Sequence, residues 1–277
     1  MTGETPALSP HIAHPLITEC PRQAWAEHRL LGNCFTLSPQ QIANRERGSA
    51  LHNLVLENGN RVVEVVADAW RTATVKHTRQ EARELGQIPM LSKDMAELKV
   101  VAARINAALA EVGISLDQGT AEEKFHWHEA SAHGDVLCSG VIDWYDRNGT
   151  IVDLKTTEGS VHPDACARAL VESASIMQDC AYRNALVSKT PGLAGRTNVL
   201  FLFAQSKPPY LVTPVTCDGT MRHIAETRWL RAVELWAKCL ARGTGPEAWP
   251  QHVDKPIEVS APGWVLAREL EAEVMGT

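Results

Sequence analysis

The feature that most constrains the fold is a run of short apolar segments between residues 122 and 216, enclosed by long amphipathic helices. The segments have the length and composition of strands, and they cover residues 122–130, 135–145, 150–156, 196–205 and 210–216. Helices are expected on both sides of the run and within it, over residues 92–112, 219–242 and about 164–189. This alternation predicts a mixed α/β fold, in which a central sheet is flanked by helices.

The N-terminal portion is expected to be mostly helical. Helices are predicted around Pro15 and Pro21, and Ser38-Pro39 is a typical helix start. Residues 61–66, RVVEVV, predict a short strand. Helical spacing is clearest between Ser92 and about Val112, where the apolar residues are Met95, Leu98, Val101, Ile105, Leu109 and Val112.

The chain shows no internal repeat and no low-complexity tract. One domain is therefore expected over residues 1–277, with a core of about 40–216 and a C-terminal helical tail of about 217–277. The apolar fraction of 44% and the charged fraction of 22% are those of an ordinary globular protein. No apolar stretch reaches the roughly 20 residues of a membrane span, and the N-terminus does not resemble a signal peptide. A cytoplasmic protein without a membrane partner is expected.

Net charge, cysteine content and the absence of one motif disfavour several further classes of protein. The net charge is −6, whereas a protein that coats nucleic acid non-specifically is usually basic. Any contact with nucleic acid is therefore expected in a local channel. The seven cysteines are scattered and form no C-x-x-C pair, which disfavours a disulfide framework or a zinc knuckle. No GxxxxGK[ST] motif is present, so no P-loop ATPase is expected.

One predicted hairpin, residues 140–157 (GVIDWYDRNGTIVDLKTT), carries the chemically distinctive side chains. Residues two apart on a strand share a face, so Asp153 and Lys155 point the same way. A two-residue turn ending at Gly149 would put Asp143 on the opposite face, whereas a three-residue turn pairs Asp143 with Asp153. The longer turn requires a left-handed residue at its end, which Gly149 supplies, and we therefore favour it.

Two carboxylates and a lysine on one sheet face suit the hydrolysis of a phosphodiester. Carboxylate oxygens bind Mg²⁺, which polarises a phosphoryl oxygen and lowers the pKa of a bound water. A neighbouring lysine can stabilise the negative charge that develops in the transition state. The alternative is an exposed hairpin with a surface Asp–Lys pair, which is the commoner meaning of a bare D-x-K motif. The additional Asp143, on its own apolar strand, favours the site.

The chain resembles the PD-(D/E)XK nuclease superfamily, in particular the phage-recombination exonucleases similar to exodeoxyribonuclease VIII. The resemblance covers roughly residues 8–215. It rests on the order and spacing of GSALHNLVLE with His52, QIPMLSKDMAELKVVAARI, IVDLKTT, QDCAY with Gln178 and Tyr182, and FLFAQSKPPYLV. The sequence departs from the family where Ile142 replaces the proline, Asp153 replaces the commoner glutamate, and Gln205-Ser206-Lys207 stands where a glutamate is frequent.

The resemblance implies a restriction-endonuclease-like central sheet and a set of site residues. The implied ligands of Mg²⁺, for which Mn²⁺ would substitute, are His52, Asp143, Asp153 and the backbone carbonyl of Leu154. Lys155 would assist the attacking water, and Gln178 and Tyr182, four residues apart on one helix face, would contact DNA. Residue patterns alone would make His52 a core histidine and Tyr182 a half-buried core residue.

The activity implied by the resemblance is that of a Mg²⁺-dependent exonuclease. It would act 5′-to-3′ on double-stranded DNA ends and generate single-stranded DNA for phage-type recombination. The implied assembly is a homo-oligomeric ring, either a trimer or a tetramer, and the implied partner is a single-strand annealing protein. One alternative is an endonuclease or a CRISPR-adaptation-like nuclease, many of which carry an iron–sulfur cluster that these cysteines do not suit. Another is a catalytically silent module that binds DNA or a partner, which would be expected to lack an acid or the lysine.

Several other residues have two interpretations. His126 and His128 share a strand face and could bind a metal, but such a short motif is usually not a site. Either Glu122 or Glu123 could approach the metal, and the sequence does not choose between them. Arg22, Arg45 and Arg47 could contact phosphates, or they could lie on solvated helix faces. Core or subunit contacts, rather than base stacking, are expected for Trp229, Trp236, Trp249 and Trp264.

Overall fold

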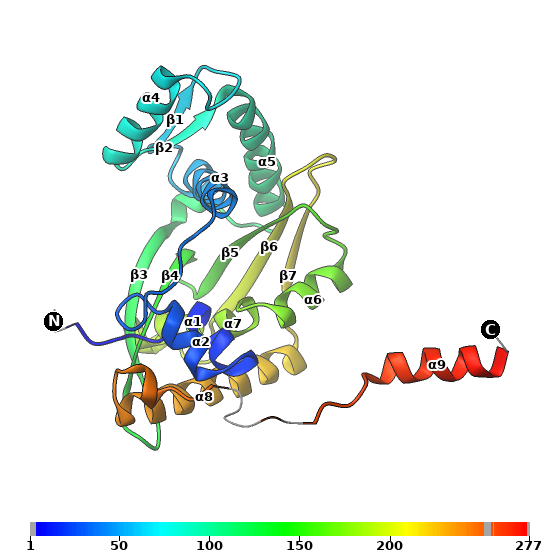
Figure 1. Ribbon diagram of the computed structural model, residues 1–277. Helices are drawn as coiled ribbons and strands as arrows, with labels where there is room; N and C mark the ends of the chain where they lie inside the picture. Colours follow the sequence, from blue (N-terminus) through cyan, green and yellow to red (C-terminus); the bar gives the residue numbers. More distant parts are fainter. Residues whose placement is uncertain (1–3, 252–255, 257, 276–277) are drawn as a thin grey trace.

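The centre of the computed structural model, which describes residues 4–251, 256 and 258–275, is a five-stranded sheet (Figure 1). Its strands lie side by side in chain order: β3 (Gly119–Glu129), β4 (Val136–Asp146), β5 (Thr150–Thr157), β6 (Asn198–Gln205) and β7 (Val212–Thr216). β5 and β6 are parallel, and the other neighbouring pairs are antiparallel. The predicted mixed α/β fold with a sheet flanked by helices is confirmed.

One face of the sheet packs against a group of helices drawn in the lower half of Figure 1. These are α1 (Pro10–Thr18), α2 (Pro21–Glu27), α6 (Pro163–Glu172), α7 (Ser175–Lys189) and α8 (Gly219–Arg242). Inward-facing strand residues such as Ile151 and Phe201 are fully buried among them. The predicted N-terminal helical portion and the 219–242 helix belong to this layer.

The other face is covered by a second layer, drawn at the top of Figure 1. It consists of α3 (Pro39–Leu56), β1 (Val62–Val65), α4 (Ala73–Glu84), β2 (Ile88–Leu91) and α5 (Ser92–Glu111). β1 and β2 form a separate parallel pair. α5 confirms the predicted amphipathic helix, because Met95, Leu98, Val101, Ile105 and Leu109 are all buried. Val112, the last residue of the predicted apolar set, is 45% exposed just beyond the helix end.

Three elements differ from the sequence-based expectation. β2 is a four-residue strand whose residues are all buried, so it has no alternation to mark it. α4 buries only Ala82 and has no apolar periodicity, so it was not predicted. The single helix expected over about 164–189 is wrong: it is divided at Ser173, whose backbone is extended. The Ser173 hydroxyl accepts a hydrogen bond from the Ser175 backbone, which competes with continuation of the helix.

The tryptophans of the C-terminal region are mostly core residues. Trp229 and Trp236 of α8 are fully buried, and so is Trp249, which packs edge-on against Trp236 with 4.9 Å between ring centroids. These three rings cannot supply a subunit interface, which the sequence left open. Trp264 is different: it is 70% exposed on α9 (Gly263–Met275), which extends away from the body in Figure 1.

Short 3₁₀ helices span Leu116–Gln118, Pro191–Leu193 and Pro246–Ala248. Among the residues that the structure describes, no helix combines the length and apolar character needed to cross a bilayer.

Candidate metal centre

The β4–β5 hairpin has the predicted register. Trp144 pairs with Val152 and Tyr145 with Ile151, so the turn comprises the three residues 147–149. Gly149 has a left-handed backbone with φ +96°. The Asp146 carboxylate closes the turn by accepting the backbone N–H groups of residues 148 and 150 at 2.9 and 2.8 Å. The three-residue turn is therefore confirmed.

This register sets Asp143 opposite Asp153 at the position where the regular ladder between β4 and β5 ends. One carboxylate oxygen of Asp143 instead accepts the backbone N–H of Leu154 at 2.7 Å. Asp143 thus lies in the gap between two parting strands. The side chain holds the strand ends together and remains 13% exposed.

β3 contributes a third acid at the same level of the sheet. Ala121 pairs with Trp144 and Glu123 with Ile142, so Glu122 lies opposite Asp143. Glu122 has φ +50°, which interrupts the regular alternation of the strand. Glu123 consequently points to α7, where it binds Lys189, while Glu122 points to α3. The structure thereby selects Glu122, the residue that sequence reasoning did not separate from its neighbour.

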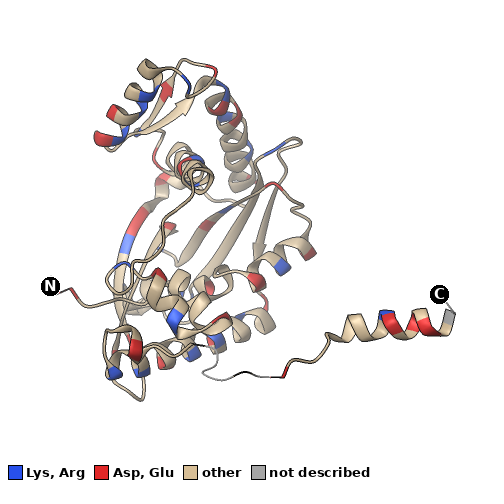
Figure 2. Cartoon of the chain, in the orientation of Figure 1, with Lys and Arg blue, Asp and Glu red and all other residues tan. Residues whose placement is uncertain are grey.

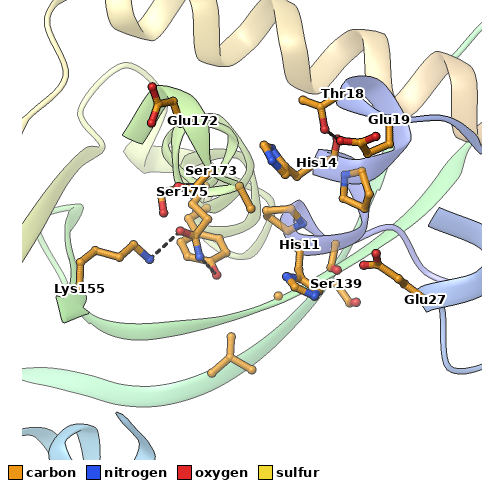
Figure 3. Close-up of a pocket in the computed structure, with 18 of the residues that line it drawn as sticks. His11, His14, Thr18, Glu19, Glu27, Ser139, Lys155, Glu172, Ser173 and Ser175 are labelled. Carbon is orange, nitrogen blue, oxygen red and sulfur yellow. Dashed lines mark hydrogen bonds between the residues drawn. The ribbon is translucent and has the colours of Figure 1, made fainter. Parts of the chain in front are cut away.

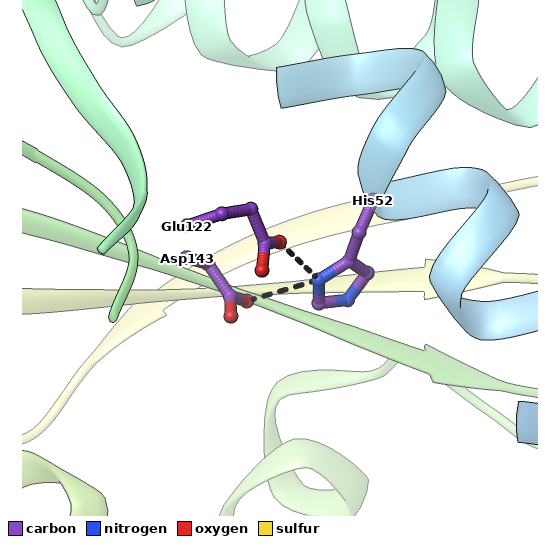
Figure 4. Close-up of side chains that lie close together, drawn as sticks. All are labelled: His52, Glu122 and Asp143. Atoms are coloured by element: carbon purple, nitrogen blue, oxygen red, sulfur yellow. Dashed lines mark hydrogen bonds and ion pairs between the residues drawn. The ribbon is translucent and has the colours of Figure 1, made fainter. Parts of the chain in front are cut away.

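His52 of α3 completes a compact cluster with these acids (Figure 4). Its Nδ1 lies 3.3 Å from Glu122 Oε1 and 3.6 Å from Asp143 Oδ2. One potential ligand atom from each of the three residues lies within 4.8 Å of the others. Two carboxylates and an imidazole are ligands that divalent cations such as Mg²⁺ and Mn²⁺ accept. The cluster could therefore hold a divalent metal ion.

Electrostatics in the cluster support this interpretation. Burial raises the pKa of the Asp143 carboxyl to about 7, and the nearby Asp153 carboxylate adds to the shift. Burial alone would lower the pKa of His52, but its hydrogen bond to Glu122 and the charge of Asp143 outweigh that effect, so the pKa is raised. The crowded acids thus favour bound protons. A divalent cation would supply the same compensation and displace those protons.

The remaining predicted residues form a chain of contacts beside the cluster. Asp153 is 1% exposed and forms an ion pair with Lys155. The Lys155 ammonium donates to Gln178 Oε1 at 2.7 Å, and Gln178 Nε2 donates to the Tyr182 hydroxyl at 2.9 Å. Burial raises the pKa of Tyr182, so its hydroxyl stays protonated.

The predicted site residues therefore meet in one region, from two strands and two helices, and Glu122 joins them from a third strand. Asp153 contacts Lys155 and does not belong to the three-residue cluster that Glu122 completes. The contribution of the Leu154 carbonyl stays a prediction. The sequence named Glu122 and Glu123 together from their place at the start of the strand, and it could not choose between them because the orientation of Glu122 depends on the irregular backbone of β3.

A cavity of about 840 Å³ opens next to Lys155, Gln178 and Tyr182 (Figure 3). Its far wall is α1, which contributes His11 and His14. A volume of this size is in the range of small-molecule and nucleotide sites. The contact chain that ends at Tyr182 is therefore accessible to a ligand.

Other candidates do not enter the centre. His126 and His128 are exposed on β3 and lie outside the cluster of potential metal ligands. Arg22 donates to the Trp249 carbonyl, and Arg47 pairs with two acids of α5, so both have structural partners. Arg45 is exposed on α3.

No protein-family model matches the chain, and no curated protein matches it. Its fold is similar to that of a protein from Eubacterium rectale named "Putative exonuclease", with a TM-score of 0.56 and 10% identity over 94% of this chain and 92% of that chain. A second solved structure, SSO0001, has 14% identity over 68% of this chain and 84% of that chain, and its TM-score of 0.29 is too low to indicate a shared fold. The first likeness concerns the fold, over nearly the whole length of both chains.

Proposed function

We propose that this protein is a metal-dependent nuclease of the PD-(D/E)XK type. The observation that carries the proposal is the meeting of His52, Glu122 and Asp143, with potential ligand atoms within 4.8 Å, beside the Asp153–Lys155 pair of the next strand. Acids on neighbouring strands with an adjacent lysine suit the metal-assisted hydrolysis of a phosphodiester.

The residues would divide the work as follows. A bound Mg²⁺ or Mn²⁺ would polarise a phosphoryl oxygen and lower the pKa of a bound water. Asp143, His52 and Glu122 would hold the ion, joined by Asp153 and the Leu154 carbonyl as the sequence resemblance implies. Lys155 would orient the attacking water and stabilise the developing negative charge. Gln178 would keep the Lys155 ammonium in place, and its hydrogen bond to Tyr182 supports that role.

The finer proposal is a 5′-to-3′ exonuclease that acts on double-stranded DNA ends and supplies single-stranded DNA for phage-type recombination. It is supported by the sequence resemblance, and the similarity in fold to the Eubacterium rectale protein is consistent with it. An endonuclease would use the same chemistry. The silent binding module is less favoured, because both acids and the lysine are present and close together.

The direct test is cleavage of end-labelled linear duplex DNA with Mg²⁺ or with EDTA, compared with circular duplex and single-stranded DNA. We expect Mg²⁺-dependent loss of the linear duplex from the 5′ end, and no activity in Asp143→Asn. Equal cleavage of circular DNA would indicate the endonuclease. Absence of cleavage of every substrate, with Mg²⁺ and with Mn²⁺ in its place, would contradict the nuclease assignment.

We further propose a ring-shaped trimer or tetramer that encloses the DNA and works with a single-strand annealing protein. A closed ring would let local basic groups line a channel while the net charge of −6 stays outside. Light scattering at working concentration tests the assembly. A stable monomer that degrades linear duplex processively would show that enclosure is not needed.

A further inference from the structure

A row of exposed polar side chains continues from the candidate metal centre along one face of β3. Phe125 and Trp127 are buried against the helices of the lower layer, so Lys124 and His126 face the opposite way, as Glu122 does. Residues two apart on a strand are separated by about 7 Å. Figure 2 shows the change of sign along the strand, where the acidic positions of β3 are followed directly by a basic one.

This face of β3 and β4 forms the floor of two adjoining cavities. The cavity of about 840 Å³ next to Lys155 includes Lys124 and Ser139, and so does a second cavity of about 470 Å³. Ser9 and Glu27, from the opposite wall, also line both. The two cavities are therefore parts of one groove, which runs from Lys155 past Lys124 to Arg29.

The segment that leads into the opposite wall is fixed to the edge of the floor by backbone hydrogen bonds. Leu8 donates to the Leu137 carbonyl at 2.9 Å and accepts from the Ser139 N–H at 2.8 Å. The segment before α1 thus lies alongside β4 as an added strand. This pairing fixes where α1, and with it the wall, begins relative to the floor.

The basic side chains of the groove differ in how strongly they are paired with acids. Lys124 is exposed and forms no ion pair with any residue in the described part of the chain. At the far end, Arg29 meets Glu4 at 3.5 Å, but both side chains are well exposed, so solvent and salt weaken that pair. The acid that lines both cavities, Glu27, lies on the wall. Lys124 on the floor can therefore reach a ligand without first losing a carboxylate partner, and Arg29, which follows α2 on the side of the wall, has only its exposed pair with Glu4 to give up.

We propose that this groove binds one nucleic-acid strand, whose phosphates contact Lys124, His126 and Arg29 as the strand leads away from the metal centre. The proposal rests on the proposed nuclease function for the chemistry of the ligand. Cavities of about 840 and 470 Å³ accommodate a few nucleotides of a single strand. Phosphate contacts position a strand without reading its sequence, so binding is sequence-independent.

The test is equilibrium binding of a fluorescent oligothymidylate of about 16 nucleotides, a length at the upper end of common single-strand sites. Anisotropy is measured in EDTA over a series of KCl concentrations, so that no cleavage occurs. Each lost phosphate contact makes the slope of log affinity against log salt shallower by about 0.7. Relative to the wild type, the affinity gained between 1 M and 0.1 M salt would then be smaller by about 5-fold. Lys124→Gln and Arg29→Gln are each expected to show a change of this size.

His128→Ala is the matched control, because His128 is exposed on the same face of β3 but lines neither cavity. It should bind as the wild type does. Thermal unfolding should be the same for all variants, since the substituted side chains are exposed. Equal salt slopes for the wild type and Lys124→Gln, or no binding of the oligonucleotide by the wild type, would overturn the proposal that the groove binds a strand.

Cleavage of linear duplex with Mg²⁺ is measured in parallel to separate the two proposals. Metal-dependent cleavage, together with salt slopes that do not differ between the wild type and the variants, would support the nuclease function and refute strand binding in the groove. Altered slopes without any cleavage would support the groove and refute the nuclease.

Discussion

The crowding of acids around His52 should make the metal-free protein lose stability as pH rises. The responsible group is Asp143, whose pKa of about 7 in the folded protein compares with about 3.9 in an unfolded chain. A raised pKa means that its contribution to stability is complete below the unfolded value and is lost as pH rises through the folded value. The raised pKa of His52 acts in the same direction.

The size of the effect follows from the proton that Asp143 retains. The unfolded carboxyl is already ionised at about pH 5.5, whereas the folded one is largely protonated there and largely ionised at about pH 8. Proton linkage between these two pH values lowers the free energy of unfolding by about 2 kcal/mol from Asp143 alone. A bound divalent cation would replace the proton, so added Mg²⁺ or Mn²⁺ should stabilise the protein more at the higher pH.

The assay is urea unfolding in EDTA at the two pH values, for wild type and Asp143→Asn. The variant lacks the titrating carboxyl, so its loss between the two pH values should be smaller by about 2 kcal/mol. Glu158→Gln, which removes a well-exposed carboxylate just beyond the end of the neighbouring strand β5, should behave as the wild type does. If Asp143→Asn loses as much stability as the wild type, the argument from buried acids is refuted.

Three further predictions concern individual residues. Lys155→Ala should reduce cleavage by about 10²–10³ while Mn²⁺ binding, measured by calorimetry, persists; near-normal cleavage would remove Lys155 from the mechanism. Glu122→Gln should weaken Mn²⁺ binding by more than about 10-fold, the lower end of what loss of even a supporting residue costs, whereas Glu123→Gln should not, and equal effects would contradict the orientation of the pair. Gly149→Ala should destabilise the fold by about 1–3 kcal/mol in urea unfolding, because φ is +96° and a Cβ would lie 3.2 Å from the Arg196 carbonyl. Gly192→Ala, where a Cβ meets no atom within 4 Å, is its control and should cost far less.

The local parts of the site could be predicted from the sequence. The position of Asp143 opposite Asp153 depends on the turn, and Gly149 shows which turn forms because few other residues tolerate its backbone conformation. Lys155 shares a face with Asp153 through the two-residue repeat of a strand. The long helix α5 was equally predictable, since five buried residues repeat at helical spacing.

The tertiary structure decided the rest. The burial of Trp229 and Trp236 depends on packing partners far along the chain. His52 meets Glu122 across 70 positions of sequence, and no local pattern encodes such a contact. Glu122 turns toward His52 while Glu123 turns toward α7 because the β3 backbone is left-handed at that one position. Such a conformation is unfavourable for glutamate by itself, and it persists only where surrounding contacts stabilise it.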